Sequence, residues 1–163
     1  MINNTIKITC KNLDDTKKLA ENFSKHIKNG VFACLLGEIG AGKTAFVKFI
    51  AKAMGITEKV TSPSFVILNE YKTENKVPFY HFDLYRLEHT GVSSISDELR
   101  EYSKDGIYTF VEWAEFSDEQ LPFDRIDINV TYNDDESRNY EFTAQCEKYI
   151  KVIEELKNDF AQL

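Results

Sequence analysis

One eight-residue stretch constrains this chain more than any other part of its sequence. Residues 37–44 read GEIGAGKT and match the phosphate-binding pattern GxxxxGK followed by Ser or Thr. The glycines allow the backbone to turn its N–H groups toward phosphate oxygens, Lys43 can reach the β- and γ-phosphates, and the Thr44 hydroxyl can hold Mg²⁺. The stretch predicts a nucleotide site to which all eight residues contribute: Gly37, Glu38, Ile39, Gly40, Ala41, Gly42, Lys43 and Thr44.

The residues on either side of this stretch support the same prediction. Val31–Leu36 is a continuous apolar run, typical of a strand covered on both faces. Apolar residues at helical spacing follow over 43–54, and Gly55 provides a stop signal. A strand, a glycine-rich turn and a helix in this order are the context that a phosphate loop requires, because the helix start adds the positive end of its dipole.

The rest of the pattern predicts a single α/β domain over residues 1–163. Asp14 or Asp15 is expected to cap a first helix, whose apolar face is Leu19, Phe23 and Ile27 and which Gly30 closes. The other expected elements are strands at 5–10, 66–71, 77–83 and 107–113, a short helix at 97–102, a hairpin of 126–132 with 140–145, and a last helix at 148–163. We therefore expect a three-layer sandwich of the P-loop NTPase type, with a mixed, mostly parallel sheet and a C-terminal hairpin plus helix.

Charge and composition limit the kinds of partner. The net charge of −7 argues against a protein that holds nucleic acid by itself, because phosphate binding needs a basic face. The widely spaced Cys10, Cys34 and Cys146 lack the spacing of a metal site and are expected to be reduced thiols. No leader follows Met1 and no apolar run reaches the length of a membrane span, so we expect a cytoplasmic protein without a membrane role.

Two acidic residues end apolar-rich runs, Asp83 after 79–82 and Glu112 after 108–111. A phosphate loop needs such a carboxylate for Mg²⁺, and ligands of α/β sheets bind at the carboxyl edge of the strands. Either residue could hold Mg²⁺ directly or through water, or orient an attacking water. A plain surface carboxylate is the alternative, but beside a phosphate loop we favour catalytic roles for both, together with Lys43.

A cluster of hydroxyl residues lies between the loop helix and the next strand. Thr61, Ser62 and Ser64 surround a proline there, and they fit a switch that senses the γ-phosphate as well as they fit an ordinary turn. The guanine motif Asn-Lys-x-Asp is missing from the chain, because Val77 and Pro78 follow Asn75-Lys76. ATP is therefore favoured over GTP as the substrate.

Three further residues have a simple structural interpretation and a functional one. For Arg86, a surface ion pair is the simpler interpretation, and neutralisation of transition-state charge is the functional one. For Trp113, packing in the core is the simpler interpretation, and a place beside the nucleotide is the functional one. His81 alternates with aromatic residues, so we interpret it as a strand residue with a hydrogen-bond partner and not as a catalytic base.

Taken together, these segments resemble the TsaE (YjeE) family, the small ATPases of bacterial tRNA threonylcarbamoyladenosine synthesis. The family pattern contains, in order, a GxxGAGKT loop, a V-x-S-P-T-F segment, a Y-H-x-D-L-Y-R block and an E-W pair. In this chain the four motifs stand at 37–44, 60–65, 80–86 and 112–113. The resemblance runs from about Leu13 to about Trp113.

This resemblance implies ATP hydrolysis with Mg²⁺ as cofactor. Lys43 would bind phosphate, Thr44 and Glu112 would serve the metal, and Asp83 would be the Walker B-like acid. The other implied positions are the switch residues Ser62 and Ser64, the site neighbours Arg86 and Trp113, and Asp15 and Thr16 beside the nucleotide.

The resemblance also implies partners. Members of the family act with the TsaD–TsaB pair, which transfers the threonylcarbamoyl group to adenosine 37 of tRNAs that read ANN codons. The ATPase would reset or activate that complex, be slow without it, and contact tRNA only indirectly. An acidic protein suits this role because its partners hold the tRNA.

The chain departs from the family pattern at a few positions. Ser64 replaces the usual Thr and keeps the hydroxyl, and Ala45 stands where a second Thr is common. The segment 87–102 is shortened, with Glu98 where a Gly is expected, which affects the local geometry and the partner surface more than ATP binding.

Two other functions compete with a partner-driven ATPase. A small-molecule kinase needs an acceptor pocket and usually several arginines in a lid, and the four arginines here form no cluster in the sequence. A nucleotide-gated binding protein, in which ATP only orders a switch, is the stronger rival and predicts binding without turnover.

Overall fold

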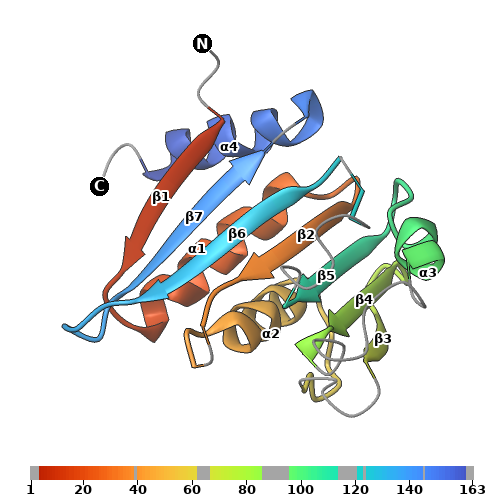
Figure 1. Cartoon of the computed structure of the whole chain (residues 1–163), viewed down its shortest axis with the longest axis horizontal. Helices are drawn as coiled ribbons and strands as arrows, with labels where there is room; N and C mark the ends of the chain where they lie inside the picture. Colours follow the sequence, from red (N-terminus) through yellow and green to blue (C-terminus); the bar gives the residue numbers. More distant parts are fainter. Residues whose placement is uncertain are drawn as a thin grey trace.

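A computed structural model describes residues 4–38, 40–61, 67–85, 96–113, 121–122, 124–144 and 146–160. The elements follow in the order β1 (Thr5–Cys10), α1 (Leu13–His26), β2 (Val31–Leu36), α2 (Lys43–Ala53), β3 (Leu68–Lys72), β4 (Pro78–Asp83), α3 (Ser96–Glu101), β5 (Tyr108–Glu112), β6 (Ile126–Tyr132), β7 (Arg138–Ala144) and α4 (Glu147–Phe160) (Figure 1). Each expected strand and helix is present, with ends that lie within three residues of the expected ones.

The strands of this part of the chain form one sheet in the order β1-β7-β6-β2-β5-β4-β3. The pairs β6/β2, β2/β5 and β5/β4 are parallel, whereas β1/β7, β7/β6 and β4/β3 are antiparallel. The sheet is therefore mixed, and the expectation of a mostly parallel sheet is wrong. The reason is a second hairpin, in which the Thr73 N–H donates to the Val77 carbonyl at 3.0 Å and turns the chain directly from β3 into β4.

Helices α1, α2 and α4 cover one face of the sheet (Figure 1). The apolar face expected for α1 is confirmed, because Leu19 and Phe23 are buried in the main core cluster. The helix starts at Leu13, since the Asn12 side chain caps it by accepting the Asp15 N–H at 2.9 Å. Asp14 and Asp15 are thus first-turn residues that favour the positive end of the dipole, and neither is the cap.

Strand β2 is buried on both faces, as expected from its apolar run. Val31, Ala33 and Leu35 belong to the core under the helices, while Phe32 and Cys34 belong to a second cluster on the other face. In the described ranges, α3 is the helix that contributes to this second cluster, through Leu99. A complete third layer remains a prediction.

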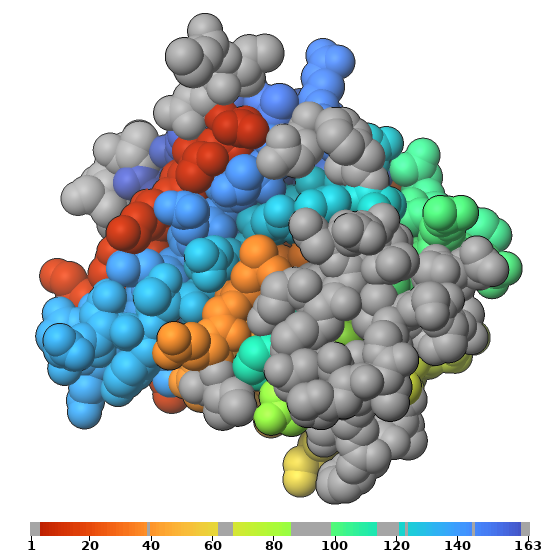
Figure 2. All heavy atoms as spheres, viewed as in Figure 1, coloured from red at the N-terminus to blue at the C-terminus, as the bar shows by residue number. Residues whose placement is uncertain are grey.

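The antiparallel half of the sheet is polar on the face away from the helices. Along β6, the buried Ile126, Ile128 and Val130 alternate with more exposed polar residues. Figure 2 shows atoms of β1, β7 and β6 at the surface on this side of the molecule. One buried and one solvated face is typical of antiparallel sheets, and it explains the alternating pattern of the C-terminal hairpin.

Three observations bear on the remaining expectations from composition. Cys10 and Cys34 are buried, Cys146 is half-buried, and all three are free thiols. Burial raises the pKa of the Cys10 thiol to about 11, so this thiol stays protonated at neutral pH. Of the helices described, none has both the length and the apolar character needed to cross a membrane.

The centre of the main core is aromatic and predicts a large stability effect. The Phe46 ring of α2 lies 4.8 Å from the Tyr140 ring and 6.2 Å from the Phe142 ring. Phe46→Ala should lower the free energy of unfolding by about 3–5 kcal/mol, because a closely packed core cannot collapse around the cavity. Urea unfolding measures this as a lower midpoint at constant slope. Phe49→Ala, at a half-buried position of the same helix, is the control. An equal loss of unfolding free energy in both variants would contradict the placement of Phe46 at the centre of the core.

Candidate functional site

The candidate site lies at one edge of the sheet, where β2, β4 and β5 end. The strand register places Glu112 beside Leu35 on one side and beside Asp83 on the other. The loop 37–44 leaves β2 at this edge and leads into α2. Parallel strands bring their carboxyl ends together, so residues distant in sequence meet beside one loop.

The loop depends on glycines for its path. Gly37 has a φ of 141°, and a Cβ there would collide with the Val130 carbonyl oxygen of β6. Gly42 has a φ of 111° and starts α2 without any side-chain cap. No acidic residue lies in the first turn of this helix, which leaves the positive end of its dipole without a carboxylate of its own helix.

Lys43 points into the site and is 5% exposed. Its ammonium donates a hydrogen bond to the Gly37 carbonyl oxygen and lies 3.3 Å from the centre of the Trp113 ring. The Trp113 ring in turn lies 5.0 Å from that of Tyr85, and Trp113 has a left-handed φ of 60°. Trp113 therefore lies beside the loop lysine, and it also packs against the second core cluster, as the simpler expectation had it.

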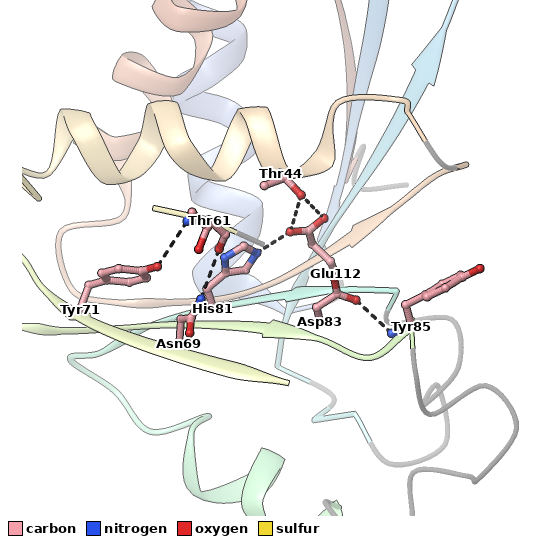
Figure 3. Close-up of polar contacts among 8 residues, drawn as sticks. All are labelled: Thr44, Thr61, Asn69, Tyr71, His81, Asp83, Tyr85 and Glu112. Atoms are coloured by element: carbon pink, nitrogen blue, oxygen red, sulfur yellow. Dashed lines mark hydrogen bonds and ion pairs between the residues drawn. The ribbon is translucent and has the colours of Figure 1, made fainter. Parts of the chain in front are cut away.

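Thr44 and Glu112 are in direct contact (Figure 3). The Thr44 hydroxyl lies 2.8 Å and 2.9 Å from the two Glu112 carboxylate oxygens, to which it donates. Glu112 also contacts Nε2 of His81, a residue for which sequence reasoning predicted only a hydrogen-bond partner. The Asp83 carboxylate accepts the Tyr85 N–H at 3.0 Å.

These residues line a pocket of about 390 Å³. Its lining residues are Gly40, Gly42, Lys43, Thr44, Ala45, Asp83, Tyr85, Glu112 and Trp113. No group of three His, Cys, Asp or Glu side chains in the described residues could hold a metal by itself. A hydroxyl and a carboxylate side by side are oxygen donors that suit Mg²⁺, which usually takes few protein ligands and completes its shell with phosphates and water.

A second pocket, of about 380 Å³, is lined by residues 10–13 and Thr16 together with Tyr132, Glu136 and Arg138. Arg138 of β7 lines it and also packs on the loop, since a Cβ on Gly42 would lie 3.2 Å from the Arg138 Nε. The Arg138 guanidinium lies 5.5 Å from the Tyr132 ring, which lines the same pocket. Sequence reasoning missed both residues, because neither belongs to a recognisable motif.

The two early candidates differ in their placement. Thr16 is buried and lines the second pocket. Asp15 does not line it, and the Asp15 carboxylate instead accepts the Lys11 N–H at 3.0 Å at the start of α1. Of the two, Thr16 therefore lies in the pocket, whereas the Asp15 side chain bonds to the backbone just before α1.

The expected switch is only partly visible. Thr61 lies outside the first pocket, where its carbonyl oxygen accepts from the Asn69 side chain at 3.3 Å and its N–H donates to the Tyr71 hydroxyl at 3.4 Å (Figure 3). The other expected site residues that lie outside the described residues are Ile39, Ser62, Ser64 and Arg86, and the side chain of Glu98 is also not described.

Comparisons with known proteins give one consistent result. Residues 10–140 match the family model described as threonylcarbamoyl adenosine biosynthesis protein TsaE. The tRNA threonylcarbamoyladenosine biosynthesis protein TsaE of Bacillus subtilis is 39% identical over 145 residues, 89% of each chain. Its namesake from a Nostoc species is 35% identical, over 87% of this chain and 88% of its own. A crystal structure of Bacillus subtilis YdiB superposes with a TM-score of 0.79 at 33% identity, over 98% of this chain and 97% of that one.

Proposed function

This chain belongs to the TsaE family, and on that premise we propose that it is a Mg²⁺-dependent ATPase serving tRNA threonylcarbamoyladenosine synthesis. One observation carries the proposal beyond the family name. The Thr44 hydroxyl and the Glu112 carboxylate meet beside the buried Lys43, in a pocket that begins at a glycine-rich loop. A cation and two oxygen donors next to an uncapped helix start suit a metal-bound triphosphate.

Each residue of the pocket then has a role in the proposed reaction. The Lys43 ammonium would leave the Gly37 carbonyl oxygen and bind the β- and γ-phosphates. Thr44 and Glu112 would hold Mg²⁺, which when bound supplies positive charge against the phosphate oxygens. Asp83 would act at the same edge, either as a further metal partner or by orienting the attacking water, while Trp113 and Tyr85 would limit the access of bulk water.

The second pocket would receive the nucleoside. Arg138 lines this pocket and packs against Gly42, so one side chain connects the pocket with the phosphate loop. The exposed Tyr132 ring offers a stacking surface for a base, and the Thr16 hydroxyl lies in the same pocket. ATP is the proposed substrate because the chain lacks the guanine motif.

The proposed partners are homologues of TsaD and TsaB. A net charge of −7 gives this chain little affinity of its own for tRNA, so its effect on tRNA modification would pass through proteins that hold the tRNA. Hydrolysis would reset or activate that complex, and the transfer of the threonylcarbamoyl group would take place on the partners.

Phosphate release from ATP tests this function directly. We expect slow Mg²⁺-dependent release by the chain alone and a rate that rises to saturation as the TsaD–TsaB pair is added. GTP serves as the control nucleotide and should be hydrolysed more slowly. Turnover that stays at background with both partners present, despite tight ATP binding, would contradict the ATPase and favour a nucleotide-gated binding protein.

A further inference from the structure

His81 is a buried residue in the middle of β4, and none of its side chain reaches solvent: its exposed fraction is 0%. It alternates along the strand with Tyr80 and Phe82, which pack on the other face of the sheet. On its own face it lies between Phe79, which belongs to the core under the helices, and Asp83 at the candidate site. His81 thus occupies the boundary between the apolar core and the site.

The imidazole makes a single hydrogen bond within the described residues. Its Nε2 contacts Oε2 of Glu112, and because a carboxylate oxygen accepts, Nε2 carries the proton of this bond (Figure 3). The Nδ1 atom is buried and has no partner among the residues described. A histidine buried for packing alone would gain nothing from this arrangement over an apolar residue, since burying a polar ring is costly.

Glu112 is held from two sides. Thr44 donates to its carboxylate from α2, and His81 contacts it from β4. If the Thr44 oxygen turns its lone pairs toward a cation, the hydrogen bond from Thr44 to Glu112 changes its geometry. The hydrogen bond from His81 to Glu112 is unaffected by that change. Loss of that bond would leave the carboxylate free to rotate about its last torsion, which is broad and weakly restricted.

We propose that His81 is a positioning residue that orients the Glu112 carboxylate for the metal of the nucleotide. This role rests on the proposed function, because it concerns the same site. His81 touches neither nucleotide nor metal in this scheme; it acts through Glu112. Partners of metal ligands commonly have this role, since they fix the ligand's orientation and raise its affinity for the ion.

The test compares His81→Leu with His81→Gln in the full chain. Leucine removes the donor while filling much of the space, whereas the glutamine amide places a donor near the position of Nε2. Titration calorimetry measures the affinity for the non-hydrolysable analogue AMP-PNP, first with Mg²⁺ and then with EDTA. In H81L, the factor by which Mg²⁺ increases the affinity for AMP-PNP should be about 10-fold or more smaller than in wild type, while the affinity in EDTA is unchanged. In H81Q, this factor should be close to that of wild type.

His26→Leu is the matched control. The His26 ring also contacts carboxylates, Glu155 at 2.6 Å and Asp159 at 2.5 Å, but none of these residues lines the candidate site. H26L should keep the full effect of Mg²⁺. If H81L does not fold, His81→Asn takes its place, because asparagine is too short to reach Glu112.

The outcomes separate this inference from the function on which it rests. Equal Mg²⁺-dependent tightening in wild type and H81L would overturn the positioning role and leave the ATPase proposal intact. His81 would have a purely structural role if H81L lost as much affinity for AMP-PNP in EDTA as with Mg²⁺. The same conclusion would follow if H81Q lost as much affinity as H81L. If Mg²⁺ has no effect on the wild-type affinity, the proposed metal site fails and this inference fails with it.

Discussion

Lys43→Ala should weaken ATP binding by about 30-fold or more, because the loss of a buried charge partner for phosphate costs about 2–5 kcal/mol. Lys43 is 5% exposed, and its ammonium donates to the Gly37 carbonyl oxygen and lies over the Trp113 ring beside the pocket. Titration calorimetry with ATP and Mg²⁺ measures the loss, and circular dichroism checks that the variant folds.

The control for this variant lies five residues further along α2. Lys48 is exposed on the same helix and carries the same charge, so Lys48→Ala changes the net charge equally without touching the pocket. We expect its ATP affinity to stay within about twofold of wild type, because exposed charges contribute little. An unchanged affinity in K43A would show that residues 37–44 do not form the nucleotide loop.

Glu112→Gln is expected to reduce Mg²⁺-dependent turnover by about 100-fold or more, since the loss of a partner behind a metal ligand already costs about 10- to 100-fold. The substitution keeps the size of the side chain but removes its charge. In the wild type, the Thr44 hydroxyl and His81 Nε2 both donate to Glu112. The glutamine amide N–H₂ would face one of these two donors, so one hydrogen bond would be lost. Phosphate release with the partner pair present measures the effect.

Asp83→Asn separates the two acidic roles left open by the sequence. If Asp83 orients water, this variant should lose turnover and keep its Mg²⁺-dependent affinity for AMP-PNP, while E112Q should lose both. Glu154→Gln, an exposed change on α4, controls for the lost charge and should behave as wild type. Normal turnover by E112Q would remove Glu112 from the proposed mechanism.

The elements of the fold were predictable because each has a local cause. The apolar run of β2 and the glycine and proline signals between segments required no knowledge of the neighbours. The predicted hairpin of β6 and β7 is confirmed. The start of α1 was placed wrongly, because Asn12, Asp14 and Asp15 are all capable caps and only the backbone path selects Asn12.

The character of the sheet was harder to predict. Residues 73–76, between β3 and β4, are polar, but whether a polar connection makes an antiparallel edge at β3 depends on which strands pair. The position of β1 beside β7 depends on the same information, since these strands lie at opposite ends of the chain. Local patterns carry no register between distant segments, so the proportion of parallel strands was overestimated.

The sequence by itself determined the loop at 37–44, because turn geometry, lysine and hydroxyl are encoded within eight consecutive residues. It also pointed to Asp83 and Glu112, which end strands whose carboxyl edges must meet. Only the tertiary structure decided what surrounds them. Thr44 and Glu112 are 68 positions apart, and His81 and Glu112 are 31 apart, so their contacts exist only because parallel strands share one edge. Arg138 reaches the loop from the start of β7, an antiparallel strand that no motif marks, so its contact with the loop also depends on the pairing of strands.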